Sequence, residues 1–190
     1  SGDKKNKSEP LVIPLSFAAI TYDGKVNQEK LLIIDQPKQK FLIDNLPKDK
    51  ELPILSLFRS FSAPVKWKSD LSEDELFTLF RFDDDPFSRW NSGQHLMSIA
   101  LIARASGNAN IKLESNLINT LSELIKTFEG KDLEELSILI DLPGLPELEL
   151  IKSLVDPIAL YKSRIFLASL FGSSLADQLK SLLVTTEDEC

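Results

Sequence analysis

The sequence predicts two parts of different fold class, an all-β sandwich followed by an all-α antiparallel bundle of helices. Up to about residue 70 the apolar residues alternate as in strands, and beyond it they recur at three- and four-residue steps as in helices. The charge changes at the same point: residues 1–70 contain 12 Lys and Arg against 9 Asp and Glu, whereas residues 71–190 contain 10 against 20. The expected parts are a disordered arm or tag at 1–10, a β-sandwich at 11–69 and an incomplete α-helical part at 70–190.

The predicted strands include one proline and one turn. Apolar residues alternate between Leu11 and Phe17, and Pro14 within this run favours a sheet edge or a bulge because proline cannot donate to a strand ladder. The segment from Tyr22 to Lys25 contains Asp-Gly and is typical of a turn. Further strands are expected at 31–34, 40–44 and 65–68, and short strands at this spacing favour a sandwich.

Helix starts and ends are marked throughout the second part. Ser72 and Glu75 form a predicted capping box. Asp85-Pro86 and Asp156-Pro157 each place an N-cap acid before a proline at the first helical position. Three glycines mark expected helix ends: Gly107, Gly130 and Gly172. We expect six or seven helices in a bundle or the start of an α-solenoid, and a polar loop at 185–190.

The composition argues against several classes of protein. No apolar run approaches the roughly 20 residues that span a bilayer, and no signal peptide is recognisable. The one cysteine, Cys190, cannot form an internal disulfide, which agrees with a reducing compartment. The acidic helical part repels phosphate backbones, so we expect no nucleic-acid partner. A solvated helix surface explains this charge, and attraction of basic peptides is the alternative.

No residue pattern in the chain predicts a catalytic or metal site. His95 is the only histidine, and without a second His or Cys nearby we interpret it as a surface or interface residue. The run from Asp83 to Asp85 lacks the alternating spacing of a calcium loop, and we assign it to helix capping. Glu134 and Glu135, beside Asp132, are interpreted as a helix start on a wet face.

Two motifs on either side of the change in period resemble one family. The segment Arg59-Ser60-Phe61-Ser62-Ala63-Pro64-Val65 resembles the end of the small β-domain in bacterial aminopeptidase N, the alanyl aminopeptidases. The segment Asp85-Pro86-Phe87-Ser88-Arg89-Trp90, with Gln94 four residues on, resembles the opening of their helical domain. Further similarity lies at 11–15, 23–25 and 155–159. The resemblance covers nearly the whole chain from Leu11 onward.

The resemblance implies an immunoglobulin-like sandwich followed by the first stacked helix pairs of a larger enzyme. The family's sandwich has another strand before the point that matches Leu11, so we expect a sandwich without its first strand. Its unpaired edge would then pair with a second copy. The open end of the helical stack is likewise expected to expose apolar surface and to self-associate.

The resemblance also implies that the reactive centre lies elsewhere. The family's zinc site is a His-Glu-x-x-His helix with a more distant Glu, whereas His95 is followed by Leu96 and Met97. We therefore expect a non-catalytic scaffold segment of a cytoplasmic zinc aminopeptidase, whose parent binds zinc and releases N-terminal amino acids from peptides. The alternatives are a protein–protein interaction module with no enzymatic parent and, less favoured, a hydrolase that uses carboxylates alone.

Seven residues of the two motifs are expected to form the structural junction between the sandwich and the helices. Four of them are expected to fix the angle between the two parts: Phe61, Pro64, Arg89 and Trp90. Arg89 is expected to reach loop carbonyls or a carboxylate while Trp90 packs beneath it. A direct contact of Arg89 and Trp90 with substrate is the alternative. The seven junction residues are Arg59, Phe61, Pro64, Asp85, Arg89, Trp90 and Gln94.

Overall fold

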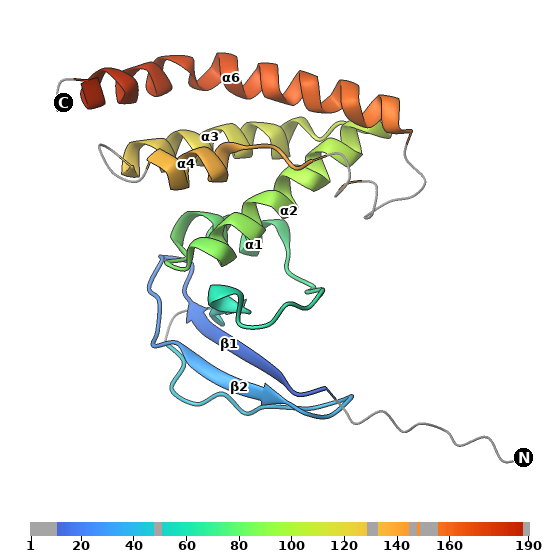
Figure 1. Cartoon of the computed structure of the whole chain (residues 1–190), viewed down its shortest axis with the longest axis vertical. Coiled ribbons are helices and arrows are strands. Elements are labelled where there is room, and N and C mark those ends of the chain that lie inside the picture. The colour runs from blue at the N-terminus through green and yellow to red at the C-terminus, as the bar shows by residue number, and fades with distance from the viewer. Residues whose placement is uncertain (1–10, 48–50, 129–132, 145–147, 149–155, 188–190) are drawn as a thin grey trace, which may run out of the picture.

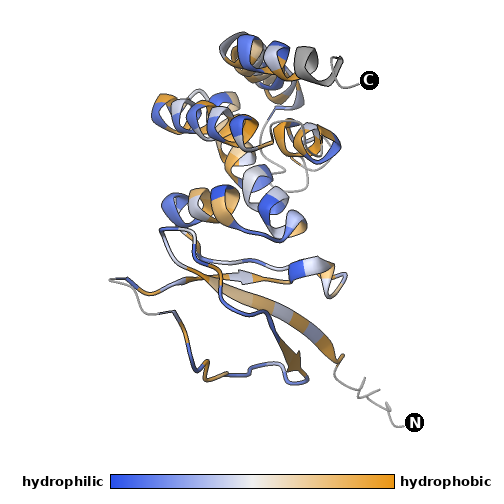
Figure 2. Ribbon diagram, turned by 90° about the vertical axis from the view of Figure 1, so that its left-hand side faces the viewer, coloured by the Kyte–Doolittle hydropathy of each residue, from blue (hydrophilic) through white to orange (hydrophobic). Residues whose placement is uncertain are grey.

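A small sheet lies at one end of the molecule and a stack of helices at the other (Figure 1). The computed structural model describes residues 11–47, 51–128, 133–144, 148 and 156–187, with side chains described as far as residue 182. The strands β1 (Ile13–Ile20) and β2 (Lys30–Ile34) lie at one end of the molecule, and α6 (Pro157–Glu187) forms the outermost layer of the helical stack at the other. Figure 2 shows the helices in layers above the sheet, each with both hydrophobic and hydrophilic stretches, as amphipathic helices have.

The sheet consists of three antiparallel strands in the order β2-β1-β3, with β1 in the centre. The strands are β1 (Ile13–Ile20), β2 (Lys30–Ile34) and β3 (Ile54–Leu57). Pro14 lies opposite Ile33 in the first half of β1, where β2 is the only paired neighbour. The other side of β1 is unpaired at Pro14, so the missing backbone N–H of the proline leaves no strand hydrogen bond unmade. This part of β1 is therefore a sheet edge, as predicted.

Two predicted strands are wrong and one strand was missed. Residues 40–44 and 65–68 form no strand, and β3 was not predicted. The side chains of Ile43, Val65 and Trp67 nevertheless pack against the buried sheet core, which comprises Leu15, Phe17, Phe58 and Ala63. Alternation reports which face of a segment is buried, whereas a strand also needs a hydrogen-bonding neighbour.

The turn between β1 and β2 has the predicted position. Thr21 N donates to Lys25 O at 3.0 Å, and Gly24 N donates to Thr21 O at 2.9 Å. Gly24 has a φ of 85°, a conformation that favours glycine. The Asp-Gly dipeptide therefore predicted the turn correctly.

Five α-helices of eight residues or more lie within the described ranges. They are α1 (Glu73–Phe82), α2 (Pro86–Ala105), α3 (Ile111–Thr127), α4 (Leu133–Ile140) and α6 (Pro157–Glu187), and a 3-10 turn, η1 (Arg59–Phe61), precedes them. Leu148 is also helical. Figure 1 shows α3, α4 and α6 stacked roughly side by side, with α2 running obliquely from α1 towards them.

The predicted helix starts are confirmed at all three positions. The Ser72 hydroxyl accepts from Glu75 N at 3.3 Å, and the Glu75 carboxylate accepts from Ser72 N at 2.7 Å, which completes the capping box. Asp85 caps α2. Asp156 accepts from Ile158 N at 3.0 Å at the start of α6. Each cap satisfies a backbone N–H that the helix itself leaves free.

The predicted helix ends are confirmed once and wrong twice. Gly107 lies just beyond α2 with a φ of 77°, as a terminating glycine does. Gly172, in contrast, lies inside α6, and residues 185–187 belong to the same helix rather than to a loop. Buried Phe171 and Leu175 on either side of Gly172 hold this turn in the core. Packing thus outweighs the roughly 1 kcal/mol by which glycine disfavours a helix. Gly130 lies outside the described residues.

Arg104 joins three helices at the far end of α2. Its guanidinium donates to both carboxylate oxygens of Glu114 on α3, at 2.9 and 2.6 Å. The same guanidinium lies 3.8 Å from the ring centroid of Phe166 on α6. A bidentate pair with a nearly buried carboxylate fixes orientation as well as distance, so α2, α3 and α6 have one defined arrangement.

The sheet and the first helix share part of their apolar core. Ile20 of β1, Ile54 of β3 and Leu79 of α1 form one buried cluster. The helices have their own larger core, in which the ring of buried Phe80 lies directly against Gly93. A Cβ at Gly93 would lie 2.6 Å from Phe80 Cε2, so the close approach of α1 and α2 requires glycine at this position.

Candidate functional site: a polar junction between the sheet and the helices

The junction centres on the buried side chain of Arg59. This residue begins η1 two positions after β3 ends, and it is only 4% exposed. Three neighbouring residues have left-handed backbone conformations: Phe58, Ser60 and Phe61, with φ of 57°, 53° and 52°. Such conformations cost of the order of 1–3 kcal/mol each for residues other than glycine. The surrounding contacts must therefore stabilise this turn.

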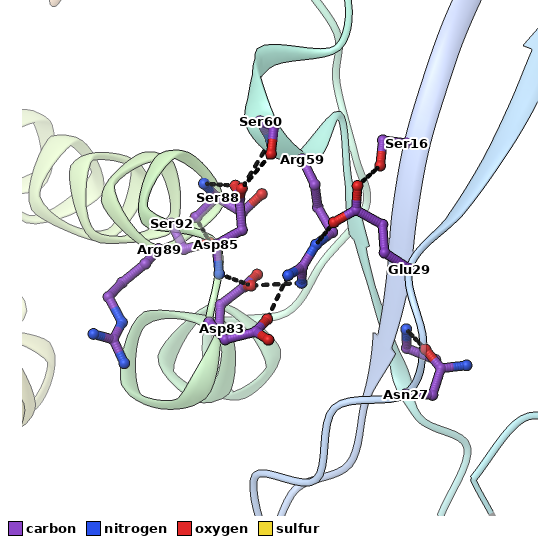
Figure 3. A network of polar contacts seen from close by, with 12 residues as sticks. Ser16, Asn27, Glu29, Arg59, Ser60, Asp83, Asp85, Ser88, Arg89 and Ser92 are labelled. Atoms are coloured by element: carbon purple, nitrogen blue, oxygen red, sulfur yellow. Dashed lines mark hydrogen bonds and ion pairs between the residues drawn. The ribbon is translucent and has the colours of Figure 1, made fainter.

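The guanidinium of Arg59 binds three carboxylates from two distant parts of the chain (Figure 3). Its Nε donates to Glu29 Oε2 at 2.9 Å, its Nη1 to Asp83 Oδ1 at 2.8 Å, and its Nη2 to Asp84 Oδ1. Glu29 in turn accepts from the hydroxyl of Ser16 in β1. A single arginine thus links the sheet to the loop between α1 and α2.

Asp85 makes a second link between η1 and the helices. Its Oδ1 accepts from Ser88 N at 2.8 Å and so caps α2. Its Oδ2 accepts from Ser60 N at 2.8 Å and from the Ser60 hydroxyl at 3.1 Å. Asp85 N donates to Asp83 Oδ1 at 3.0 Å, which joins the two links into one network (Figure 3).

Asp83 is the carboxylate in this network that depends most on Arg59. Its side chain is 0% exposed, whereas those of Glu29 and Asp84 are 45% and 63% exposed. Burial raises the pKa of the Asp83 carboxyl, and the charge of Arg59 opposes that rise. Asp83 Oδ2 is buried without a hydrogen-bond partner among the described residues. Loss of Arg59 would therefore leave a buried charge with no cation.

An aromatic row extends from the junction along the start of α2. The Phe61 ring, 56% exposed, meets Phe87 edge-on with centroids 5.2 Å apart. Phe87 and Trp90 follow with centroids 6.0 Å apart. Edge and tilted pairs at these separations are favourable. The row connects η1 to the helical core, against which Trp90 packs.

The structure brings only part of the predicted junction together. Arg59, Phe61, Asp85 and, through Phe87, Trp90 lie in contact at the boundary. Arg89 instead lies among helices: its Nη2 donates to Arg81 O at 3.1 Å, and its Nη1 is 3.9 Å from Glu135 Oε1.

Gln94 and Pro64 lie away from the network. The Gln94 amide donates to Asp141 O at 2.8 Å, just beyond the end of α4. Pro64 is exposed, next to Ala63 in the sheet core. In the described contacts, therefore, neither Gln94 nor Pro64 takes part in the Arg59 network that links the sheet to the helices.

The sequence did not predict the carboxylate partners of Arg59. Assignment of the acidic run to helix capping is correct for Asp85, whereas Asp83 and Asp84 bind Arg59. Glu29 was not singled out. For Asp83 and Asp84 the sequence does contain a signal. A helix N-cap uses only one acidic side chain, so two of the three adjacent acids need another partner. Glu134 and Glu135 do lie in the first turn of α4, and Asp132 lies outside the described residues.

Among the residues that the structure describes, the junction holds no set of side chains suited to zinc. His95 is exposed on α2. Within the described part of the chain, no group of three or more His, Cys, Asp or Glu side chains is placed to hold a metal ion. Zinc requires such a set of nitrogen, sulfur or carboxylate ligands, so these residues do not fit the ion. The charged side chains of the network instead pair with one another and hold the sheet part and the helices in a defined orientation.

Comparisons with known proteins identify the two parts. Residues 73–189 match a family described as "Domain of unknown function (DUF3458_C) ARM repeats", and residues 1–70 match "Domain of unknown function (DUF3458) Ig-like fold". The chain therefore belongs to the DUF3458_C family of ARM repeats, here preceded by its Ig-like partner domain. The predicted fold class, an immunoglobulin-like part followed by a helical repeat part, is confirmed.

Curated relatives confirm the resemblance to bacterial aminopeptidase N. Aminopeptidase N of Caulobacter vibrioides is 31% identical over 168 residues, which cover 88% of this chain and 19% of that protein. Aminopeptidase N of Escherichia coli is 26% identical over 187 residues, 93% of this chain and 21% of that protein. The chain thus spans about a fifth of the length of these relatives.

A solved structure agrees with both findings. The crystal structure of Legionella pneumophila aminopeptidase A in complex with aspartic acid matches with a TM-score of 0.77 and 29% identity. The match covers 91% of this chain and 20% of that one. The similarity therefore extends across the sheet, the junction and the helices together.

Proposed function

We propose that the chain is a non-catalytic scaffold segment of a zinc-dependent aminopeptidase that releases N-terminal amino acids from peptides. The observation that supports this most strongly is the end-to-end similarity to aminopeptidase N over about a fifth of its length. The ligand set for zinc and the carboxylate that activates water would belong to sequence outside this chain. This segment would contribute shape rather than chemistry.

In this proposal the junction sets the angle between the Ig-like part and the helices. Arg59 and Asp85 would be the principal positioning residues, because both bind across the boundary through buried polar contacts. The aromatic row of Phe61, Phe87 and Trp90 would support them. Pro64, Arg89 and Gln94 would support the local structure on either side. A rigid angle matters in an enzyme whose helices must remain in register with a distant catalytic centre.

Two experiments test the proposed function. The coding sequence adjoining this segment should encode a His-Glu-x-x-His helix with a downstream Glu, and its absence would remove the basis for an enzymatic parent. The chain alone, incubated with alanine p-nitroanilide and zinc, should release no nitroaniline. Turnover that copurifies with the chain and depends on added zinc would contradict a purely structural role.

The exposed apolar surface favours a second candidate, a protein–protein interaction module. Leu31 and Ile33 of the edge strand β2 are exposed, as are Ile158, Tyr161 and Ile165 along one face of α6. Apolar side chains on an edge strand promote pairing with another chain. We propose that the isolated segment self-associates through one of these surfaces. Light scattering that gives a monomer at high protein concentration would rule this out.

The remaining partners follow from the parent enzyme. Peptides would be bound by the parent's catalytic domain, and a cytoplasmic location and the lack of a nucleic-acid partner belong to the same proposal. Within the described residues, no helix combines the length and apolar character needed to cross a bilayer.

A further inference from the structure

An aromatic groove lies between the start of α2 and α4. Phe87 and Trp90 line it from α2, and Glu134, Glu135 and Ile138 line it from α4. Its volume is about 500 Å³, enough for several side chains of a bound segment. Ile138 is 53% exposed although it is apolar, and the aromatic row extends the surface from Trp90 and Phe87 to Phe61.

We propose that this aromatic groove binds a peptide in which an apolar side chain lies next to a lysine or arginine. The apolar lining would take up the hydrophobic side chain. The two ring faces and the two carboxylates favour a cation, because aromatic faces attract positive charge and Glu is an acceptor for ammonium and guanidinium groups. Binding of a basic peptide here is separate from the proposed aminopeptidase function and does not depend on it.

The charges around the groove select this occupant. Arg89 Nη1 lies 3.9 Å from Glu135 Oε1 and partly neutralises that acid. Glu134 is exposed, and no ion pair to it is found among the described residues. Residues 71–190 as a whole have 10 more acidic than basic side chains. A cationic peptide is therefore attracted both by the rim and by the general field of the helical part.

A second copy of the chain is a poorer fit to the same groove. A twofold interface places the same patch of each subunit against the other. The acidic rim of one copy would then face the acidic rim of the next, and like charges in such a contact oppose association. The groove therefore favours a partner of opposite charge.

Tryptophan fluorescence can test the proposal directly. The chain has two tryptophans, and Trp67→Phe would leave Trp90 in the groove as the only reporter. The probe is the peptide acetyl-Phe-Lys-Leu-Lys-amide. We expect a saturable change in Trp90 emission at micromolar to millimolar peptide, weakened by added salt. In the same background, Glu134→Gln should weaken binding about two- to fivefold and Ile138→Ser at least threefold.

Matched controls distinguish binding in the groove from non-specific attraction by the net negative charge of the helical part. Asp177→Asn removes an exposed acid on α6 and should leave the affinity unchanged. Circular dichroism melts of each variant verify that the fold is retained. Equal binding of acetyl-Phe-Glu-Leu-Glu-amide would overturn the charge argument, and an unchanged Trp90 emission throughout the titration would overturn the site. Sedimentation that shows a dimer whose formation Ile138→Ser abolishes would assign the groove to a second copy instead.

Discussion

Replacement of Arg59 by methionine should be among the most damaging single changes at the junction. Methionine keeps much of the apolar volume but removes the cation from a site that is 4% exposed. The three carboxylates then differ in their response. Glu29 and Asp84 are about half exposed and can regain water, whereas Asp83 is fully buried and cannot. Breaking a buried ion pair by removing one partner typically costs about 3–5 kcal/mol, and we assign most of that loss to Asp83.

Urea unfolding followed by circular dichroism measures this loss. A thermal melt gives a second measure. For a chain of this size each kcal/mol of lost unfolding free energy lowers Tm by about 2–4 °C, so Arg59→Met should melt roughly 6–20 °C below the unsubstituted chain. Lys25→Met, which removes an exposed ion pair with Asp23, should leave the unfolding free energy unchanged within error. The double variant Arg59→Met/Asp83→Asn should recover about half of the loss, because no charge then remains buried without a partner. A loss below about 1 kcal/mol for Arg59→Met would refute the reasoning.

Four further predictions can be checked by the same unfolding measurements. Ser72→Ala removes the capping box of α1 and should cost about 1 kcal/mol. Gly93→Ala places a Cβ against the Phe80 ring and should destabilise by about 1–3 kcal/mol, whereas Gly172→Ala meets no atom within 4 Å in a helix and should stabilise by about 0.5–1 kcal/mol. The pKa of Asp83 is raised by burial above its ordinary 3.8, so its stabilising contribution is present below that pH and is lost as the pH rises through the raised value. The unfolding free energy of the unsubstituted chain minus that of Asp83→Asn should therefore fall as the pH rises above 3.8, and a constant difference would contradict the raised pKa.

Local features of the fold were predictable from the sequence, and distant pairings were not. The capping box of Ser72 and Glu75 involves residues three apart, and the Asp-Gly turn is equally local, so both follow from neighbouring residue types. The pairing of β1 with β3 joins Phe17 to Leu57, forty residues apart. No pattern within either segment specifies that partner, so the sequence analysis does not predict the strand at Ile54–Leu57.

At the junction, too, local features were predictable from the sequence and contacts between distant residues were not. Arg59 and Asp85 were singled out because they belong to two motifs with family resemblance, and the structure does place both at the boundary. The ion pair of Arg59 with Asp83 spans 24 residues and that with Glu29 spans 30. Only the folded chain brings these charges together. Gly172 was misjudged for a related reason, since packing on both sides overrides the preference of a single residue.

The cluster of Ile20, Ile54 and Leu79 has a practical consequence for anyone who divides this chain at its family boundary. A cut between residues 70 and 73 separates Leu79 from the two isoleucines and uncovers both of them on the Ig-like half. The same cut leaves Arg59 in one product and Asp83 in the other, so Arg59 retains only Glu29 whereas buried Asp83 loses the cation that it binds. Separate expression of the halves should therefore give insoluble material, whereas a longer N-terminal product that ends after α2 keeps the shared residues together.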